Sequence, residues 1–397
     1  MHSEGEIAAL SEWACSGLAQ LTGFPSANPD FSRSYVLSLA EQMAAAVARL
    51  WGIHVDGAML LAGRAALLGL TRGGQTSAGG ATRLLKARGG WVAITLARPD
   101  DVDALPALLS NDLIGPDPWP SLARWALEHS YSDVVERAVL LDIPAAALGE
   151  AAPHAPRVQV CGTPAVPHGM ADLLVADLSS MWAGPLCGQL LSRAGAVVVK
   201  VESPRRPDGT RAGNRGFFDW MNAGKLSYCL DFDRQADELK DLLAAADVVI
   251  EGSRPIALAR RGFGPDNVKA RPGRIWLRIN GYGGHRSAFG DDAAVGGGLA
   301  GISSGVPVFC GDAIADPLTG LESALAIAQS LRRGGGELIE VQMAEVAARY
   351  AALPMAPQTA AMVTRLPTKP EFSAASELGM DNEKVRRIVA ARLGASC

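Results

Sequence analysis

The stretch LLVADLSSMWAGPLCGQLLSRAGAVVVKVE, residues 173–202, reads as a strand, a turn, a helix and a second strand. The apolar runs 173–177 and 196–202 have the length of buried strands, and the run 185–194 between them has helical character. The same alternation continues with three more strands, at 226–231, 247–251 and 274–279, and a helix at 234–245. Short apolar strands separated by helices predict a Rossmann-like α/β domain, with a parallel sheet covered on both faces.

Length and charge limit the classes of partner. A chain of 397 residues can form two domains of ordinary size. Its formal charge of −4 provides no general attraction to nucleic acid or to anionic membranes, so neither partner is expected. The scattered cysteines suggest neither a zinc site nor a disulfide framework, and a cytoplasmic location is expected. The start of the chain lacks the features of a signal peptide, and no apolar run approaches membrane-spanning length.

The first part of the chain has a different pattern of predicted elements. Three helical runs, at 7–23, 36–50 and 55–70, are followed by a strand pair near 84–96 and by shorter helices. Proline-rich stretches near 151–167 then read as a linker. We therefore predict three parts, which are residues 1–165 with a smaller α+β domain, residues 166–355 with the parallel sheet, and a C-terminal tether and helix at 356–397.

Asp316 stands out in the stretch CGDAIADPLTG, residues 310–320. An Asp before Pro317, with an alanine-rich run 321–331 behind it, predicts a carboxylate at the N-cap of a helix. The helix dipole would favour its ionised form there. A capping role alone would explain this pattern. Because histidine is nearly absent from the second half, a catalytic Asp316 would act as a nucleophile without a histidine base.

An internal repeat is also visible. Residues 16–21 resemble 300–305, the alanine-rich run 39–50 resembles 321–331, and 55–59 resemble 339–343, at one constant offset. A duplication explains three ungapped matches better than chance does. Ser32 then occupies the place of Asp316, so the first copy would lack the carboxylate.

The turn 179–185 lies where a dinucleotide fold carries its glycine-rich loop, but it has no GxGxxG pattern. A nicotinamide dehydrogenase is therefore disfavoured, although the start of a helix can still receive phosphate. Basic residues crowd the ends of the later strands, which suggests an adenosine-phosphate ligand. They are Lys200, Arg205, Arg206, Arg211, Lys225, Arg254, Arg260 and Arg261.

Several motifs together resemble one known family. They are 174–185 (LVADLSSMWAGP), 195–202 (GAVVVKVE), 208–211 (DGTR), 222–227 (NAGKLS), 246–251 (ADVVIE) with Arg254-Pro255, 281–283 (GYG) and 316–320 (DPLTG). In this order and rough spacing, from about 170 to 355, the chain resembles the family III CoA-transferases, which include formyl-CoA transferase, carnitine CoA-transferase and α-methylacyl-CoA racemase. The resemblance implies a CoA thioester and a carboxylic acid as substrates, Asp316 as the catalytic carboxylate, and neither a prosthetic group nor a metal.

The resemblance also implies sites that contact coenzyme A. Carried over position by position, they are Trp182, Ala183, Ser203, Leu230, Gly252, Ser253 and Arg260. The Asn-Phe pair that is usual in the family before Arg-Pro is Gly252-Ser253 here, so Arg205, Arg206 or Arg254 is expected to compensate.

The order of domains departs from the family. Family members carry their small domain after the catalytic Asp, whereas the similar segment here, about 78–144, precedes the sheet. With the repeat, this order suggests the back half of one copy joined to the front half of the next, with a degenerate small domain. Family members form interlocked homodimers, so a homodimer is implied.

Transfer of CoA from an acyl-CoA to a carboxylic acid, through an aspartyl anhydride and thioester, is the function that we predict. A racemase or other acyl-CoA isomerase is the first alternative. The racemase branch pairs its Asp with a histidine in a Gly-His-Asp motif, and the matching position here reads Gly290-Asp291-Asp292. The second alternative is a non-catalytic CoA-binding or scaffold protein.

Overall fold

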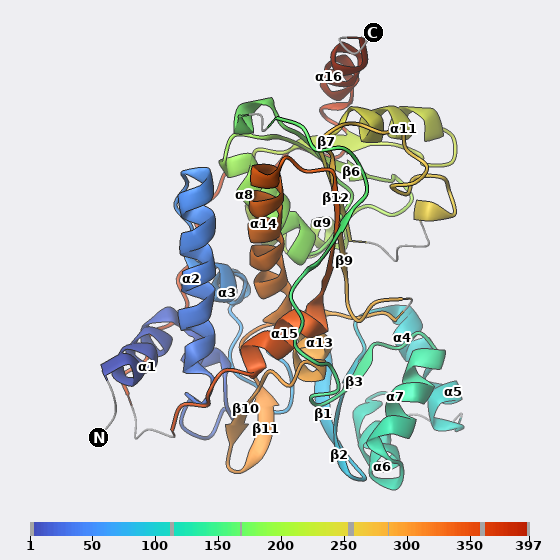
Figure 1. The fold of residues 1–397 in the computed structure, drawn as a ribbon. Coiled ribbons are helices and arrows are strands. Elements are labelled where there is room, and N and C mark those ends of the chain that lie inside the picture. The colour runs from blue at the N-terminus through green and yellow to red at the C-terminus, as the bar shows by residue number, and fades with distance from the viewer. Residues whose placement is uncertain are drawn as a thin grey trace.

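A computed structural model describes residues 4–111, 115–166, 169–252, 258–284, 286–357 and 362–394 (Figure 1). Its central feature is a sheet of seven strands in the order β4-β12-β9-β8-β5-β6-β7. All neighbouring strands pair in parallel except β4, which pairs antiparallel with β12 at one edge. The strands are β4 (Arg157–Val160), β5 (Leu174–Asp177), β6 (Val197–Glu202), β7 (Leu226–Cys229), β8 (Val248–Glu251), β9 (Ile275–Asn280) and β12 (Glu337–Gln342).

Alternate residues of these strands face two separate cores. Val175 and Val198 belong to the core on one face, while Leu174 and Val199 belong to the core on the other. Burial on both faces is the reason that the strands read as continuous apolar runs. The predicted α/β fold with a parallel sheet is confirmed. One face carries α8 (Ala183–Arg193), α14 (Ala315–Arg333) and α15 (Met343–Ala351), and the other carries α11 (Ala236–Ala245) and α16 (Asn382–Gly394).

A smaller antiparallel sheet lies beside the large one. It has the order β1-β2-β3 and its own apolar core, which the short helices around it share. These elements are β1 (Thr82–Ala87), β2 (Gly90–Thr95), β3 (Ala145–Ala147), α4 (Pro99–Asp103), α5 (Leu105–Leu109), α6 (Trp119–Glu128) and α7 (Tyr131–Leu140). Helix α13 (Gly290–Gly296) packs on β2 and β3 and so joins this sheet to the Asp316 region.

The N-terminal helices pack on the large sheet's helical layer. They are α1 (Glu4–Ser16), η1 (Leu18–Leu21), α2 (Ser34–Trp51) and α3 (Gly57–Leu68). Figure 1 shows α2 beside α14, and the two helices are in contact. Strand β4 lies within the stretch that the prolines mark as a linker, and it completes the large sheet. The division of the chain at residues 165 and 355 stays a prediction.

The remaining elements connect these layers. They are η2 (Met170–Asp172), α9 (Gly209–Ala212), α10 (Arg215–Asn222) and the hairpin of β10 (Ala300–Ser303) and β11 (Val306–Phe309). In the described ranges, no helix is both long enough and apolar enough to cross a membrane.

Candidate active site

Asp316 is the second residue of α14. The helix begins at Ala315 and its N-cap residue is Ile314, so the predicted N-cap position for Asp316 is wrong. The Asp316 N–H already donates to the Ala313 carbonyl oxygen at 2.9 Å, which starts the first turn before the proline. Pro317 fits inside that turn because N–H groups in the first turn of a helix lack an intrahelical partner in any case.

Two glycines allow other helices to approach Asp316 closely. A Cβ atom on Gly290, which opens α13, would lie 2.3 Å from Asp316 Oδ2. A Cβ on Gly320, one turn further along α14, would lie 2.7 Å from the carbonyl oxygen of Ala183 at the start of α8. The starts of α8, α13 and α14 therefore converge on the Asp316 carboxyl group.

The surroundings disfavour the charged form of Asp316. Burial raises the pKa of Asp316 to about 7, and the negative charge of Asp291 adds to the effect. Attraction by Arg64 and a hydrogen bond from the Ala183 backbone oppose it. The expectation that the helix start keeps Asp316 ionised is wrong in direction, because burial outweighs the helix terminus. At neutral pH both protonated and ionised forms are populated.

Two more carboxyl groups lie beside Asp316. The N–H of Ala313 donates to Asp291 Oδ1 at 3.0 Å. Burial, followed by the charge of Asp312, raises the pKa of Asp291 to about 6. Asp312 is fully buried and pairs with Arg64 at 2.6 Å, and its other oxygen, Oδ2, finds no hydrogen-bond partner among the described residues. The site thus holds three acidic groups, and the negative charge of one disfavours ionisation of its neighbours.

Arg64 reaches this cluster from α3. Its Cζ atom lies 5.4 Å from the ring centres of both Trp182 and Phe217, in range of a cation–π interaction. The two rings meet edge to face with centroids 5.3 Å apart. The buried Trp182 Nε1 has no hydrogen-bond partner within the described ranges. The sequence analysis missed Arg64, although one basic residue in the otherwise apolar GAMLLAGRAALL of α3 was a usable signal.

The positions predicted to contact coenzyme A lie along the carboxyl edge of the sheet. They are Trp182 and Ala183 after β5, Ser203 after β6, Leu230 after β7 and Gly252 after β8. From β5 the chain builds outward through β6 and β7 on one side and through β8 and β9 on the other. Ligands of doubly wound sheets bind at such a switch point. A Cβ on Gly252 would lie 2.9 Å from the Cβ of Ser179, so the turns after β5 and β8 adjoin there.

These positions differ in what they can offer a ligand. The Leu230 side chain is completely buried in the core, so a ligand could reach only its backbone. Arg260 is exposed. Ser253 and Arg254 lie outside the described residues. All of these contacts stay predictions.

Most basic residues at this edge have carboxylate partners. Lys225 pairs with Asp177 at 2.8 Å and Lys200 pairs with Asp208 at 2.7 Å, and all four are buried. Arg211 forms bonds to both oxygens of Glu202, at 2.9 and 2.7 Å. Arg205 lies at the surface beside Asp231 and Asp233. Lys200, Lys225 and Arg211 are therefore unsuited to the predicted phosphate contacts, because their charges are already matched.

The buried pairs shape the turn that leads into α8. Asp208 accepts a hydrogen bond from the Met181 N–H at 3.2 Å. Met181 has a φ of 73°, which a residue other than glycine rarely adopts. Lys200 Nζ also donates to the Ser179 carbonyl oxygen. The ion pairs thus hold a strained turn directly before Trp182 and Ala183.

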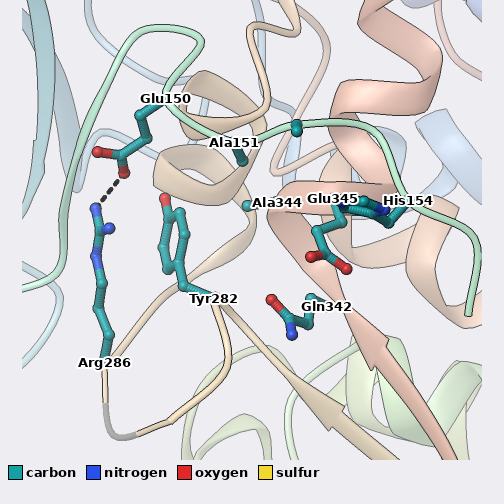
Figure 2. A pocket seen from close by; sticks show the side chains of 9 residues that line it. Glu150, Ala151, His154, Tyr282, Arg286, Gln342, Ala344 and Glu345 are labelled. Atoms are coloured by element: carbon teal, nitrogen blue, oxygen red, sulfur yellow. Dashed lines mark hydrogen bonds and ion pairs between the residues drawn. The ribbon is translucent and has the colours of Figure 1, made fainter. Parts of the chain in front are cut away.

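A pocket of about 290 Å³ lies at the carboxyl ends of β9 and β12. Figure 2 shows Tyr282 between Arg286 and the rest of this pocket, and Arg286 forms an ion pair with Glu150. The Tyr282 hydroxyl donates to the Asp292 carbonyl oxygen at 2.9 Å, which ties the pocket wall to α13. The lining residues are Glu150, Ala151, Ala152, His154, Tyr282, Arg286, Gln342, Ala344 and Glu345.

Comparison with known proteins decides the family. The model of CoA-transferase family III matches residues 170–375, which is more than half of the chain. The chain belongs to this family. The match confirms the resemblance and extends it beyond residue 355. Asp291, Asp312 and Asp316 lie within the matched segment, and Arg64 lies on a helix outside it.

Individual relatives cover a similar part. The chain is 28% identical to a succinyl-CoA–D-citramalate CoA-transferase of Chloroflexus aurantiacus, over 45% of this chain and 50% of the relative. It is 32% identical to a formyl-CoA:oxalate CoA-transferase of Afipia carboxidovorans, over 43% and 45% of the two chains. A crystal structure of a hypothetical protein from Mycobacterium tuberculosis aligns with a TM-score of 0.43 and 32% identity, over 48% and 57%. The chain spans about half the length of the curated relatives that it matches.

Proposed function

We propose that this protein transfers coenzyme A from an acyl-CoA thioester to a carboxylic acid, with the Asp316 carboxylate as the nucleophile. The observation that carries the proposal is the convergence of α8, α13 and α14 on Asp316, at the ligand-binding edge of a family III sheet. A carboxylate with a pKa of about 7 is ionised in a large fraction of molecules at neutral pH. Its partial removal from solvent leaves that anion less well solvated and therefore more reactive.

The first half of the reaction loads CoA onto Asp316. A carboxylate oxygen attacks the thioester carbonyl carbon, the C–S bond breaks, and a mixed anhydride and the CoA thiolate form. The thiolate then attacks the aspartyl carbonyl carbon, which releases the donor acid as a carboxylate and leaves an aspartyl-CoA thioester. The Ala183 N–H at the start of α8 is suited to stabilise negative charge on the oxygen during these steps.

The second half repeats these steps in reverse with the acceptor. The acceptor carboxylate attacks the aspartyl thioester, which gives a second anhydride and free thiolate. The thiolate then attacks the acceptor's acyl carbon, so that the product thioester forms and the Asp316 carboxylate is regenerated. Each step exchanges one acyl derivative for another, and no net proton or electron is consumed. Coenzyme A is thus a substrate moiety, and we propose that no prosthetic group takes part.

The sheet edge offers a place for the CoA moiety. We propose that it extends from Asp316 across the turns after β5, β6, β7 and β8. The described residues proposed along this path are Trp182, Ala183, Ser203, the backbone of Leu230, Gly252 and Arg260. The family resemblance in the sequence adds Ser253 and Arg254. Because the nearby Lys200, Lys225 and Arg211 are already paired, Arg254 and Arg260 are the arginines proposed for the phosphates.

The state of the whole protein is also a proposal. We propose a homodimer, by analogy with the interlocked dimers of the family, and a cytoplasmic location. The described cysteines are all free, which suits a reducing compartment. Light scattering during size-exclusion chromatography should give a mass of twice 41.3 kDa, and a single-chain mass would overturn the dimer.

A matrix of donors and acceptors tests the transfer. Succinyl-, formyl- and fatty acyl-CoA are combined with mono- and dicarboxylic acids, and exchange of CoA is followed by mass spectrometry. Donor and enzyme without acceptor should give a CoA adduct on the peptide that carries Asp316, and Asp316→Ala should give neither adduct nor exchange while it still binds CoA. Exchange by Asp316→Ala at the wild-type rate would overturn the mechanism.

An isomerase is the second candidate, and one observation favours it. Asp291 occupies the place of the racemase histidine, and its charge influences Asp316 directly. Two carboxyl groups with pKa values of about 6 and about 7 could exchange a proton at the α carbon from opposite sides. Incubation of 2-methylacyl-CoA in D₂O without acceptor distinguishes the two. Deuterium at the α carbon supports the isomerase, and an adduct on Asp316 supports transfer. Binding of CoA with neither result supports a non-catalytic protein.

A further inference from the structure

The charge balance at Asp316 depends on a residue from the other half of the chain. Asp316, Asp291 and Asp312 lie in the segment matched by the family model, but Arg64 lies on α3, more than a hundred residues before that segment. Arg64 attracts the ionised forms of all three carboxyl groups. Among the described residues, Arg64 is therefore the cation that acts on all three carboxyl groups, and it comes from outside the matched segment.

Several contacts hold the Arg64 guanidinium in this place. Nη1 donates to the fully buried Asp312 at 2.6 Å. The ring centres of Trp182 and Phe217 lie 5.4 Å from Cζ, and the Arg64 side chain is only 22% exposed. Ionised partners and aromatic faces are the surroundings that fix a guanidinium most firmly.

Other charged groups on the elements around α14 have partners elsewhere. Arg349 of α15 bonds Glu322 at 2.9 Å, and Arg193 of α8 donates to the His54 carbonyl oxygen. Arg278 of β9 pairs with Glu340 of β12, and Arg333 pairs with Glu337. Glu41 of α2 accepts from the Ala58 N–H at 2.8 Å, and Asp292 of α13 accepts from Phe289 and Thr95. In the part of the chain that the structure describes, the charged groups that act on Asp316 are thus Arg64, Asp291 and Asp312.

We propose that Arg64 is a positioning residue for Asp316: its guanidinium, held by Asp312 and by the rings of Trp182 and Phe217, places a positive charge beside the converging starts of α8 and α14. The N-terminal half is then part of the active site rather than an appended module. The inference rests on the proposed function, because ionised Asp316 is the nucleophile of the transfer. It goes beyond that function in assigning the nucleophile's charge state to a residue outside the matched segment.

Two charge changes of opposite kind test the proposal. Arg64→Met removes the cation, and Asp312→Asn removes a neighbouring negative charge. The pH midpoint of CoA exchange should rise by about one unit in Arg64→Met, with about a tenfold loss of rate at pH 7. The pH midpoint should fall in Asp312→Asn. Arg64→Lys keeps the positive charge and should therefore keep most of the wild-type pH profile. Arg49→Met, which removes an exposed arginine of α2, is the matched control and should leave the profile unchanged.

A second readout does not depend on activity. Carbodiimide with glycinamide modifies the protonated form of a carboxyl group, and peptide mass spectrometry follows the modification of Asp316 against pH. The labelling midpoint should shift in the same directions as the rate. Shifted labelling without CoA exchange in any variant would keep the role of Arg64 and overturn the proposed function. An unshifted midpoint in Arg64→Met would overturn the role of Arg64. If Arg64→Met fails to fold, Arg64→Gln, which also removes the charge but keeps a polar side chain, provides the same test.

Discussion

Helices α2 and α14 occupy matching places in the predicted repeat, but the acidic groups at their starts have different surroundings. At the start of α2, Asp30 is buried, and the Ser32 hydroxyl donates to its Oδ2 at 2.6 Å. Arg33 donates to three backbone carbonyl oxygens, those of Gly298, Ala300 and Ala351. The charged groups Asp30 and Arg33 at this helix start are thus matched, although the buried Ser34 hydroxyl finds no hydrogen-bond partner among the described residues. We interpret the arrangement as structural.

The start of α14 is not matched in this way. Asp312 Oδ2 and Trp182 Nε1 are buried without hydrogen-bond partners in the described part of the chain, and burial raises the pKa of Asp316 to about 7. Buried polar groups normally find partners, so an unmatched set indicates a place for a ligand. The two helices have 18 and 19 residues and pack on each other, as copies of one unit would, although the duplication itself stays a prediction.

The largest expected contrast comes from the two residues that the repeat aligns. Asp316→Asn should reduce CoA transfer by at least about a thousandfold, because the nucleophile is lost. Ser32→Ala should leave the rate unchanged within about twofold and lower the free energy of unfolding by about 1 kcal/mol. Exchange rates and urea unfolding of both variants provide the measurement. Equal loss of activity in the two variants would show that both helix starts serve one site.

The glycines that face the two helix starts give a second contrast. A Cβ on Gly290 would meet Asp316 Oδ2 at 2.3 Å, and a Cβ on Gly301 would meet Asp30 Oδ2 at 2.4 Å. Gly290→Ala should therefore displace the nucleophile and cost about a hundredfold in rate. Gly301→Ala should cost about 2 kcal/mol of stability, with the rate per folded molecule preserved. A reversed pattern, seen in paired kinetics and thermal unfolding, would contradict the assignment of the two starts.

The pH dependence of the rate should follow the ionisation of Asp316. Since only the anion attacks, transfer should rise between pH 6 and pH 8 with a midpoint of about 7. Asp291 raises the pKa of Asp316, so Asp291→Asn should move the midpoint downward and speed transfer several-fold at pH 6. The profile of initial rates at saturating donor is the measurement. A rate that falls over this range would point to the protonated form, as an acid of the isomerase would require.

The smallest expected effect comes from Asp292, and it concerns the free energy of unfolding. Its Oδ1 accepts from the Phe289 N–H and the Thr95 hydroxyl, while burial raises the pKa of Asp292 to about 7. An unfolded Asp releases its proton near about pH 4, so between pH 4 and 7 the folded state binds more protons and stability falls as pH rises. Asp292→Asn should remove this loss.

The gain of Asp292→Asn over wild type in the free energy of unfolding should grow from pH 5 to pH 8 and reach about 1 kcal/mol or more. Urea unfolding at several pH values measures it. Asp30→Asn at the matched α2 start is the control, and it should destabilise because it disturbs the bonds from Ser32. A gain for Asp292→Asn that is constant with pH would show that Asp292 stays ionised in the fold.

Local pattern was enough for the main elements. The strands at 173–177 and 196–202 and the helix between them were predictable because burial on both faces of a parallel sheet leaves continuous apolar runs. The family was also accessible, since it depends on short motifs in order. Strand β4 could not be predicted from local pattern. It lies in a stretch that reads as a linker, and its partner β12 is far away along the chain.

Tertiary structure alone decided the chemistry around Asp316. The sequence determined that a carboxylate stands at the start of a helix, but the convergence of three helices partly removes it from solvent and raises its pKa. Long-range packing also brings Arg64 to Asp312, and it pairs Lys200 and Lys225 with buried carboxylates instead of leaving them for phosphate. The physical reason is that charge state depends on burial and on neighbours in space, and neither is encoded in the residues adjacent along the chain.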